Sequence, residues 1–106
     1  MSQKTVKFVL VDAPLPVKHA GLLALKAPLD LELEAGKELH LDLGFTCDHA
    51  LLILSSGVLE VVGSGLVVGG PAKVTVRAKD TGRVSRGERV LFAMPLGLED
   101  FGVERA

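Results

Sequence analysis

Alternation of apolar and polar residues with a period of two dominates this chain. It is strictest in residues 29–34 (LDLELE) and 38–43 (ELHLDL), which are separated by the turn Ala35-Gly36-Lys37. Successive side chains of a strand point to opposite faces, so this pattern predicts two strands with one wet face each. The short turn predicts that they pair as a hairpin. Its two apolar faces would be formed by Leu29, Leu31 and Leu33 and by Leu39, Leu41 and Leu43.

Further strands are predicted between turns rich in glycine, serine and proline. They span residues 5–11, 50–54, 58–62, 66–68, 72–78 and 89–94. The run 50–54 (ALLIL) is continuously apolar and is expected to be buried on both faces. Residues 20–26 have room for two helical turns, but Gly21 and Pro28 limit them, and a short tail follows Pro95. Strands at this spacing indicate an all-β sandwich or barrel.

Composition limits the classes of function. The 106 residues suit a single domain, 1–106, with one core. A net charge of −1 gives no excess of positive charge for nucleic acid or an anionic membrane. No apolar run approaches the ~20 residues of a membrane span, and the first residues lack a signal core. The absence of asparagine, with a single glutamine, suits a hot source.

The apolar content is high for a β domain of this size. It amounts to 48% of the residues, and a small chain leaves much of its surface exposed. Unpaired strand edges also favour association. We therefore expect a symmetric homo-oligomer.

Two groups of residues are candidate metal ligands. Cys47 and His49 alternate along the chain, which places both on one face of a strand. Zinc needs four protein ligands, or three and a water, so a buried thiol beside a surface imidazole is the preferred interpretation. Glu99, Asp100 and Glu104 carry oxygen ligands suited to Mg²⁺, with a solvated acidic tail as the preferred interpretation. We expect no metal and no disulfide, since Cys47 is the sole cysteine.

Three turn segments have the composition of anion-binding loops. Ser55-Ser56-Gly57 is interpreted as a turn held by its own hydroxyls, with a phosphate cradle as the alternative. Gly63-Ser64-Gly65 and Gly69-Gly70-Pro71 are expected to be hairpin turns, with an anion nest as the alternative.

Basic residues gather in one later segment. Lys79, Arg83, Arg86 and Arg89 form a cluster that suits an acidic partner surface, or else a solvated turn. Residues 1–11 and 83–89 are the segments expected to contact a neighbouring molecule.

Five short motifs occur in an order known from one protein family. They are residues 13–16 (APLP) with 20–22 (AGL), 33–37 (LEAGK), 43–45 (LGF), 54–57 (LSSG) and 85–90 (SRGERV). Their order resembles that of the trimeric dUTPases over nearly the whole chain. The resemblance implies an all-β, dUTPase-like β-clip, a jelly-roll-like barrel of short antiparallel strands, and a homotrimer. In that family the reaction is Mg²⁺-dependent hydrolysis of a dUTP pyrophosphate bond.

The residues that perform this reaction in the family have no counterparts here. The stretch that would hold the water-activating aspartate and the stacking tyrosine is residues 63–70 (GSGLVVGG), with Gly65 and Val68 near those positions. Leu23 corresponds to the aspartate of the first motif, and Leu54 stands near the position of the arginine before Ser55. We also expect no counterpart of the glycine-rich C-terminal segment that closes over the phosphates in that family. A general base must accept a proton from water, which glycine and valine cannot do.

These differences favour a structural role. We expect no catalytic, cofactor-binding or metal-binding residues, and a homotrimer that stabilises a larger assembly. Small trimers of this kind decorate the capsids of tailed bacteriophages, which would place the protein in the virion. The alternatives are a pyrophosphatase acting on dUTP or a related dNTP, and a nucleotide-sensing pseudoenzyme, both with a cytoplasmic location.

Overall fold

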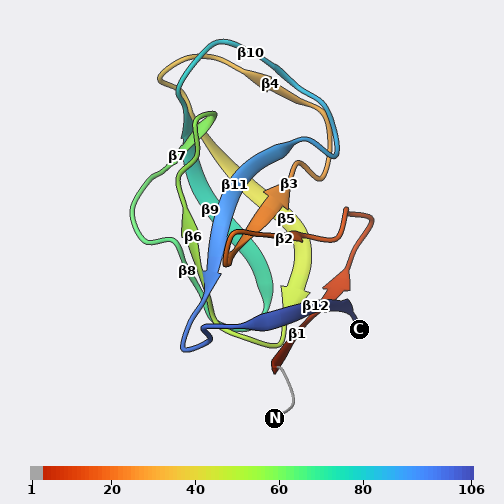
Figure 1. Cartoon of the computed structure of the whole chain (residues 1–106). Coiled ribbons are helices and arrows are strands. Elements are labelled where there is room, and N and C mark those ends of the chain that lie inside the picture. The colour runs from red at the N-terminus through yellow and green to blue at the C-terminus, as the bar shows by residue number, and fades with distance from the viewer. Residues whose placement is uncertain (1–3) are drawn as a thin grey trace.

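The computed structural model describes residues 4–106, and these residues form twelve strands and no helix (Figure 1). The strands are β1 (Lys4–Leu10), β2 (Val17–His19), β3 (Leu22–Lys26), β4 (Leu31–Leu33), β5 (Glu38–Cys47), β6 (Leu51–Leu54), β7 (Leu59–Val61), β8 (Leu66–Val67), β9 (Pro71–Ala78), β10 (Gly82–Val84), β11 (Arg89–Pro95) and β12 (Phe101–Arg105). The prediction of an all-β protein is confirmed. No helix in this part of the chain has the length and hydropathy to cross a membrane.

The strands form two large sheets and a small one. Sheet A has the order β12-β1-β5-β9-β7, and sheet B has the order β2-β3-β11-β6-β8. Strands β4 and β10 pair separately, and this two-stranded sheet is called the arm. It lies at the end of the molecule opposite to β1 and β12 (Figure 1). Both large sheets are open within the described residues, so they form two layers; of the sandwich and the barrel that the strand spacing indicated, no closed barrel is present here.

One hydrophobic cluster joins the two layers. Sheet A contributes alternate residues of its strands, such as Phe8, Leu41 and Val76, and sheet B contributes Leu25 and Leu91 in the same way. Alternation places these side chains on the inner faces, where burial of apolar area stabilises the fold. Phe8 also contacts Phe45 edge to face, with ring centroids 5.1 Å apart. No polar or charged residue of the described chain is buried.

The predicted hairpin between residues 29–34 and 38–43 is wrong. The chain does reverse at Gly36, whose φ is +82°, but β4 pairs with β10, and β5 pairs with β9 and β1. Leu33 lies opposite Gly82 in the arm, whereas Leu41 lies opposite Val74 in sheet A. Alternation determines which face of a strand is buried, but it does not determine which strand lies beside it.

Four short strands were not predicted. Residues 20–26, where helical turns were considered, belong to a hairpin of β2 and β3, whose turn has positive φ at Ala20 and Gly21. The predicted polar turn 79–82 leads directly into β10. The predicted tail contains β12, which pairs in parallel with β1 and buries Phe101 completely. This parallel pair departs from the antiparallel arrangement expected for all strands.

Candidate functional site

The outer face of sheet B is apolar. In β3, β6 and β11 the inward residues, such as Leu23, Ile53 and Ala93, belong to the core, so the residues between them point outward. Strand pairing places Val17 and Leu66 on the same side as these outward residues. The surface, called here the apolar face, consists of Val17, Leu22, Ala24, Leu52, Leu54, Leu66, Phe92 and Met94.

Strand register arranges these side chains in rows across the sheet. One row runs through Met94, Leu52 and Leu66, and the next through Val17, Ala24, Phe92 and Leu54. Cross-strand neighbours of this kind lie in direct contact. Ala24 is fully buried, and none of the other seven side chains belongs to the core cluster or packs against it. The apolar face is therefore a second hydrophobic surface, on the solvent side of the sheet.

The exposure of the apolar face is substantial. Leu66 is 50% exposed and Met94 is 38% exposed, while Leu22, Leu52, Leu54 and Phe92 are half-buried by one another. Single exposed apolar residues are common on proteins, but contiguous patches mark interaction sites.

Basic side chains border the apolar face. Lys26 on β3 lies opposite Arg89 on β11, and His19 on the edge strand β2 lies near Phe92, with ring centroids 6.2 Å apart. The strands of sheet B contain no aspartate or glutamate. The border of this surface is therefore positive.

The outer face of sheet A has the opposite character. Arg77 forms ion pairs with Glu38 on one side, at 3.3 Å, and with Glu60 on the other, at 3.9 Å. Asp42 lies opposite Lys73, and His40 lies opposite Thr75. Exposed ion pairs add little stability, but they make the surface favourable to water.

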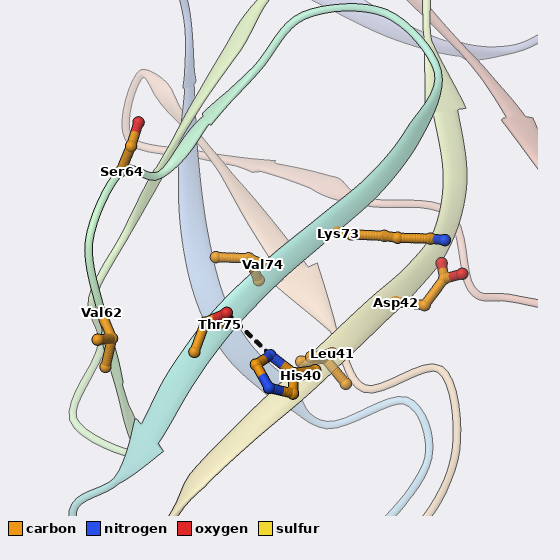
Figure 2. A pocket seen from close by; sticks show the side chains of 8 residues that line it. All are labelled: His40, Leu41, Asp42, Val62, Ser64, Lys73, Val74 and Thr75. Carbon is orange, nitrogen blue, oxygen red and sulfur yellow. Dashed lines mark hydrogen bonds between the residues drawn. The ribbon is translucent and has the colours of Figure 1, made fainter.

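A polar hollow of about 650 Å³ lies on this face of sheet A (Figure 2). His40 Nδ1 is 3.0 Å from Thr75 Oγ1, and the side chain of Lys73 extends toward Asp42 (Figure 2). Ser64, on the segment between β7 and β8, contributes to the rim. The imidazole and the hydroxyl are open to solvent, so water competes with their hydrogen bond.

The serines of residues 55–57 stabilise their own turn. The Ser56 hydroxyl donates to the Val90 carbonyl and accepts hydrogen bonds from the amides of Val58, at 3.1 Å, and Leu59, at 3.2 Å. Ser55 Oγ accepts a hydrogen bond from the Val61 amide at 2.9 Å. These contacts support the turn interpretation of this segment.

The two glycine-rich segments are not hairpin turns, as the sequence had predicted. Residues 62–65 connect β7 in sheet A to β8 in sheet B, and residues 68–70 connect β8 to β9 in sheet A. Gly65 is buried, and its carbonyl accepts a hydrogen bond from the Ile53 amide at 2.7 Å. Both segments therefore carry the chain between the two layers.

Cys47 and His49 do not share a site. Cys47 is buried in the core, and burial raises the pKa of its thiol above the ordinary value. His49 Nε2 instead lies 2.7 Å from the Leu96 carbonyl oxygen. In the acidic tail, Asp100 forms an ion pair with Lys18 at 2.9 Å. Residues 4–106 contain no group of three or more potential metal ligands.

The predicted basic cluster is divided among several partners. Lys79 donates to the Ser56 carbonyl, Arg83 pairs with Glu32 at 3.5 Å, and Arg86 pairs with Asp12 at 3.5 Å. Arg89 instead belongs to the border of the apolar face. Of the other expected contact segment, residues 1–3 lie outside the described residues, and Val6 and Phe8 are buried in the chain's own core.

The sequence analysis did not identify the apolar face, although the chain carried a signal for it. The segments LLAL, LLIL and VLFAM are apolar at consecutive positions. Such a run was interpreted in residues 50–54 as a strand buried on both faces. In the structure only the inner face of this strand is covered by the core, and Leu52 and Leu54 on its outer face are half-buried. No family model matches this chain, and no curated protein matches it in sequence.

Proposed function

We propose that this protein is a non-enzymatic structural component that self-associates as a homotrimer and stabilises a larger assembly. The observation that carries the proposal is the apolar face of sheet B. From the usual strand spacing and rise, five short strands expose on the order of 300 Å². At about 25 cal/mol per Å², covering this area on one copy stabilises an assembly by roughly 7 kcal/mol before the costs of association.

A second copy is the partner that fits this surface best. The middle of the outer face of sheet A is lined by charged residues such as Glu38, Lys73 and Arg77, so this area cannot cover an apolar face without losing hydration. Every copy of the chain carries an apolar face, and association removes apolar surface from water on both sides of the contact. Closed symmetric oligomers are the usual result.

A role in a larger lattice, such as a phage capsid, extends this proposal. We also propose that the chain has the dUTPase-like β-clip fold. The order of the five motifs and the all-β structure support this part of the proposal. With the apolar face covered by other copies, the charged face of sheet A and the arm stay available for a lattice. The arm carries the exposed pair Glu32 and Arg83. Electron microscopy of native particles labelled with an antibody against the protein tests this location.

The mass in solution tests the central claim. Light scattering after gel filtration is expected to give three times the chain mass of 11.2 kDa. Leu52→Glu, in the middle of the apolar face, is expected to give a folded monomer because it buries a charge in any contact. Thr75→Glu, on the outer face of sheet A, is the matched control and is expected to keep the native mass. A wild-type monomer at all accessible concentrations would refute the proposal.

The motif order also suggests nucleotide chemistry as a second candidate. An assay of pyrophosphate release from each dNTP with Mg²⁺ tests the hypothesis of a pyrophosphatase. Calorimetric titration with dUTP and dCTP tests the hypothesis of a nucleotide sensor. We expect no turnover and no heat of binding, because the matching stretch offers the buried Gly65 and the apolar Val68. Saturable turnover at ordinary enzyme concentrations would replace the structural role by the enzymatic one.

A further inference from the structure

A second apolar surface lies away from the apolar face. It is a hollow of about 540 Å³ between the end of β1, the link from β3 to β4, and the start of β9. Two of its apolar residues are well exposed, Val11 at 71% and Leu29 at 53%. We call it the side hollow; its lining includes Val11, Pro28, Leu29, Phe45, Thr46 and Pro71.

We infer that the side hollow of one copy receives the apolar face of the next copy, so that the subunits contact each other head to tail. This inference rests on the proposed self-association and specifies its geometry. A head-to-tail contact uses two different surfaces of each subunit and produces a ring when the rotation closes. A chain with a single apolar surface would instead pair face to face as a dimer.

The shapes of the two surfaces fit this arrangement. The apolar face belongs to a sheet and presents Met94 and Leu66 as its most exposed side chains. The side hollow is concave and has apolar residues on its floor and walls. Projecting apolar side chains that enter a recess lose more contact with water than they would against a flat surface.

The charges at the two borders are complementary. Asp12, which pairs with Arg86, and Asp42, which lies opposite Lys73, line the side hollow, whereas Lys26, Arg89 and His19 border the apolar face. In a face-to-face dimer the basic side chains Lys26 and Arg89 would meet strands that hold no acidic residue. The head-to-tail contact brings opposite charges together, which favours this orientation over the symmetric one.

Mixing two variants tests the geometry. Leu52→Glu blocks the apolar face and Val11→Glu blocks the side hollow, and each alone is expected to be monomeric by light scattering. An equimolar mixture retains one intact contact, between the side hollow of the first variant and the apolar face of the second, and is expected to form a heterodimer. Leu66→Glu, at a more exposed position than Leu52, and Leu29→Glu, at the second exposed position of the side hollow, serve as second variants if circular dichroism shows that either original is unfolded.

The outcomes separate this inference from the proposed function. A Val11→Glu protein that keeps the native mass, or a mixture that stays monomeric, overturns the head-to-tail geometry while self-association stands. A monomeric wild type refutes both. As a second measurement, Lys26→Glu with Arg89→Glu should weaken association at least 10-fold, and Asp12→Lys with Asp42→Lys in the same chain should restore it. Failure of this charge reversal to restore association also overturns the inference.

Discussion

At the scale of single residues, Gly65 allows the chain to approach β6 closely at the start of β8. It lies where the chain passes from sheet A into sheet B, and its carbonyl accepts the hydrogen bond from the Ile53 amide. A Cβ atom at this position would lie 2.2 Å from the Ile53 carbonyl oxygen, which is part of the backbone of β6. The close approach of the two backbones requires glycine here.

The substitution Gly65→Ala is expected to destabilise the fold because β6 and β8 must separate to admit a methyl group. Overpacking of this kind costs about 2–3 kcal/mol, and each kcal/mol lowers the Tm of such a domain by roughly 4–8 °C. Thermal unfolding followed by circular dichroism measures the loss. Gly57→Ala is the matched control, since an added Cβ there has no neighbour within 4 Å, and its Tm should change little. Equal effects of the two changes would contradict this account of Gly65.

Cys47 makes the stability of the fold depend on pH in the alkaline range. Burial raises the pKa of its thiol above its ordinary value, so the unfolded chain loses the thiol proton at a lower pH than the folded one. The contribution of Cys47 to the free energy of unfolding is therefore fully present below about pH 9. It decreases as the pH rises toward the folded-state pKa. Urea unfolding between pH 8 and pH 10 is expected to show this decrease, and Cys47→Ala is expected to reduce it. An identical slope in both proteins would assign the pH dependence to other groups.

At the scale of elements, β12 closes one end of the two-layer structure. It pairs with β1 in sheet A, and its neighbour Asp100 forms an ion pair with Lys18 of β2 in sheet B. The Lys18 ammonium also lies 5.1 Å from the centre of the Phe101 ring. Since Phe101 is fully buried, the last strand is part of the core.

Two phenylalanines are expected to separate folding from association. Phe101→Ala removes a buried ring and should cost about 3–5 kcal/mol of folding stability. Phe92→Ala removes a half-buried ring of the apolar face. It should therefore lower the free energy of unfolding less than Phe101→Ala does, and it should weaken association more. Urea unfolding in the monomeric Leu52→Glu background measures the first quantity, and sedimentation of the single variants measures the second. A larger folding loss for Phe92→Ala would show that the apolar face is covered within one chain.

Sequence patterns predicted eight of the strands, β1, β4, β5, β6, β7, β8, β9 and β11, because these segments alternate or form short apolar runs. Strands β2 and β10 have three residues each, too few to show a period. Strand β12 has Gly102 and three polar or half-buried positions after Phe101, and it exists because β1 lies beside it. Its pairing joins residues about a hundred positions apart, which no local pattern records.

The candidate site was harder to predict than the strands. Leu52 and Leu54 are indistinguishable by type from the buried Leu51 and Ile53, so the sequence shows an apolar strand without showing which face is covered. Only the arrangement of the sheets reveals that no element of the described chain lies over the outer face of sheet B. The turn role of Ser56 was predictable, because short hydroxyl side chains commonly bind nearby backbone amides.

At the scale of the whole molecule, the two layers have unequal outer surfaces. The outer face of sheet A carries rows of charged side chains, such as Glu38, Arg77 and Glu60, that favour contact with water. The outer face of sheet B carries leucine, phenylalanine and methionine. The molecule measures 46 × 25 × 25 Å, and its two broad outer surfaces therefore differ in their affinity for water. The high apolar content of the chain is explained by two hydrophobic surfaces, one inside and one outside.

The proposed self-association predicts that the measured stability depends on protein concentration. If copies bind only when folded, mass action raises the Tm as the concentration increases. We expect the Tm of the wild-type protein to rise steadily between micromolar and hundred-micromolar chain concentrations, since unfolding then has to oppose association as well. Leu52→Glu should have a Tm that is lower and independent of concentration, whereas Thr75→Glu should follow the wild type. A concentration-independent wild-type Tm together with a monomeric mass would mean that the apolar face does not bind a second copy.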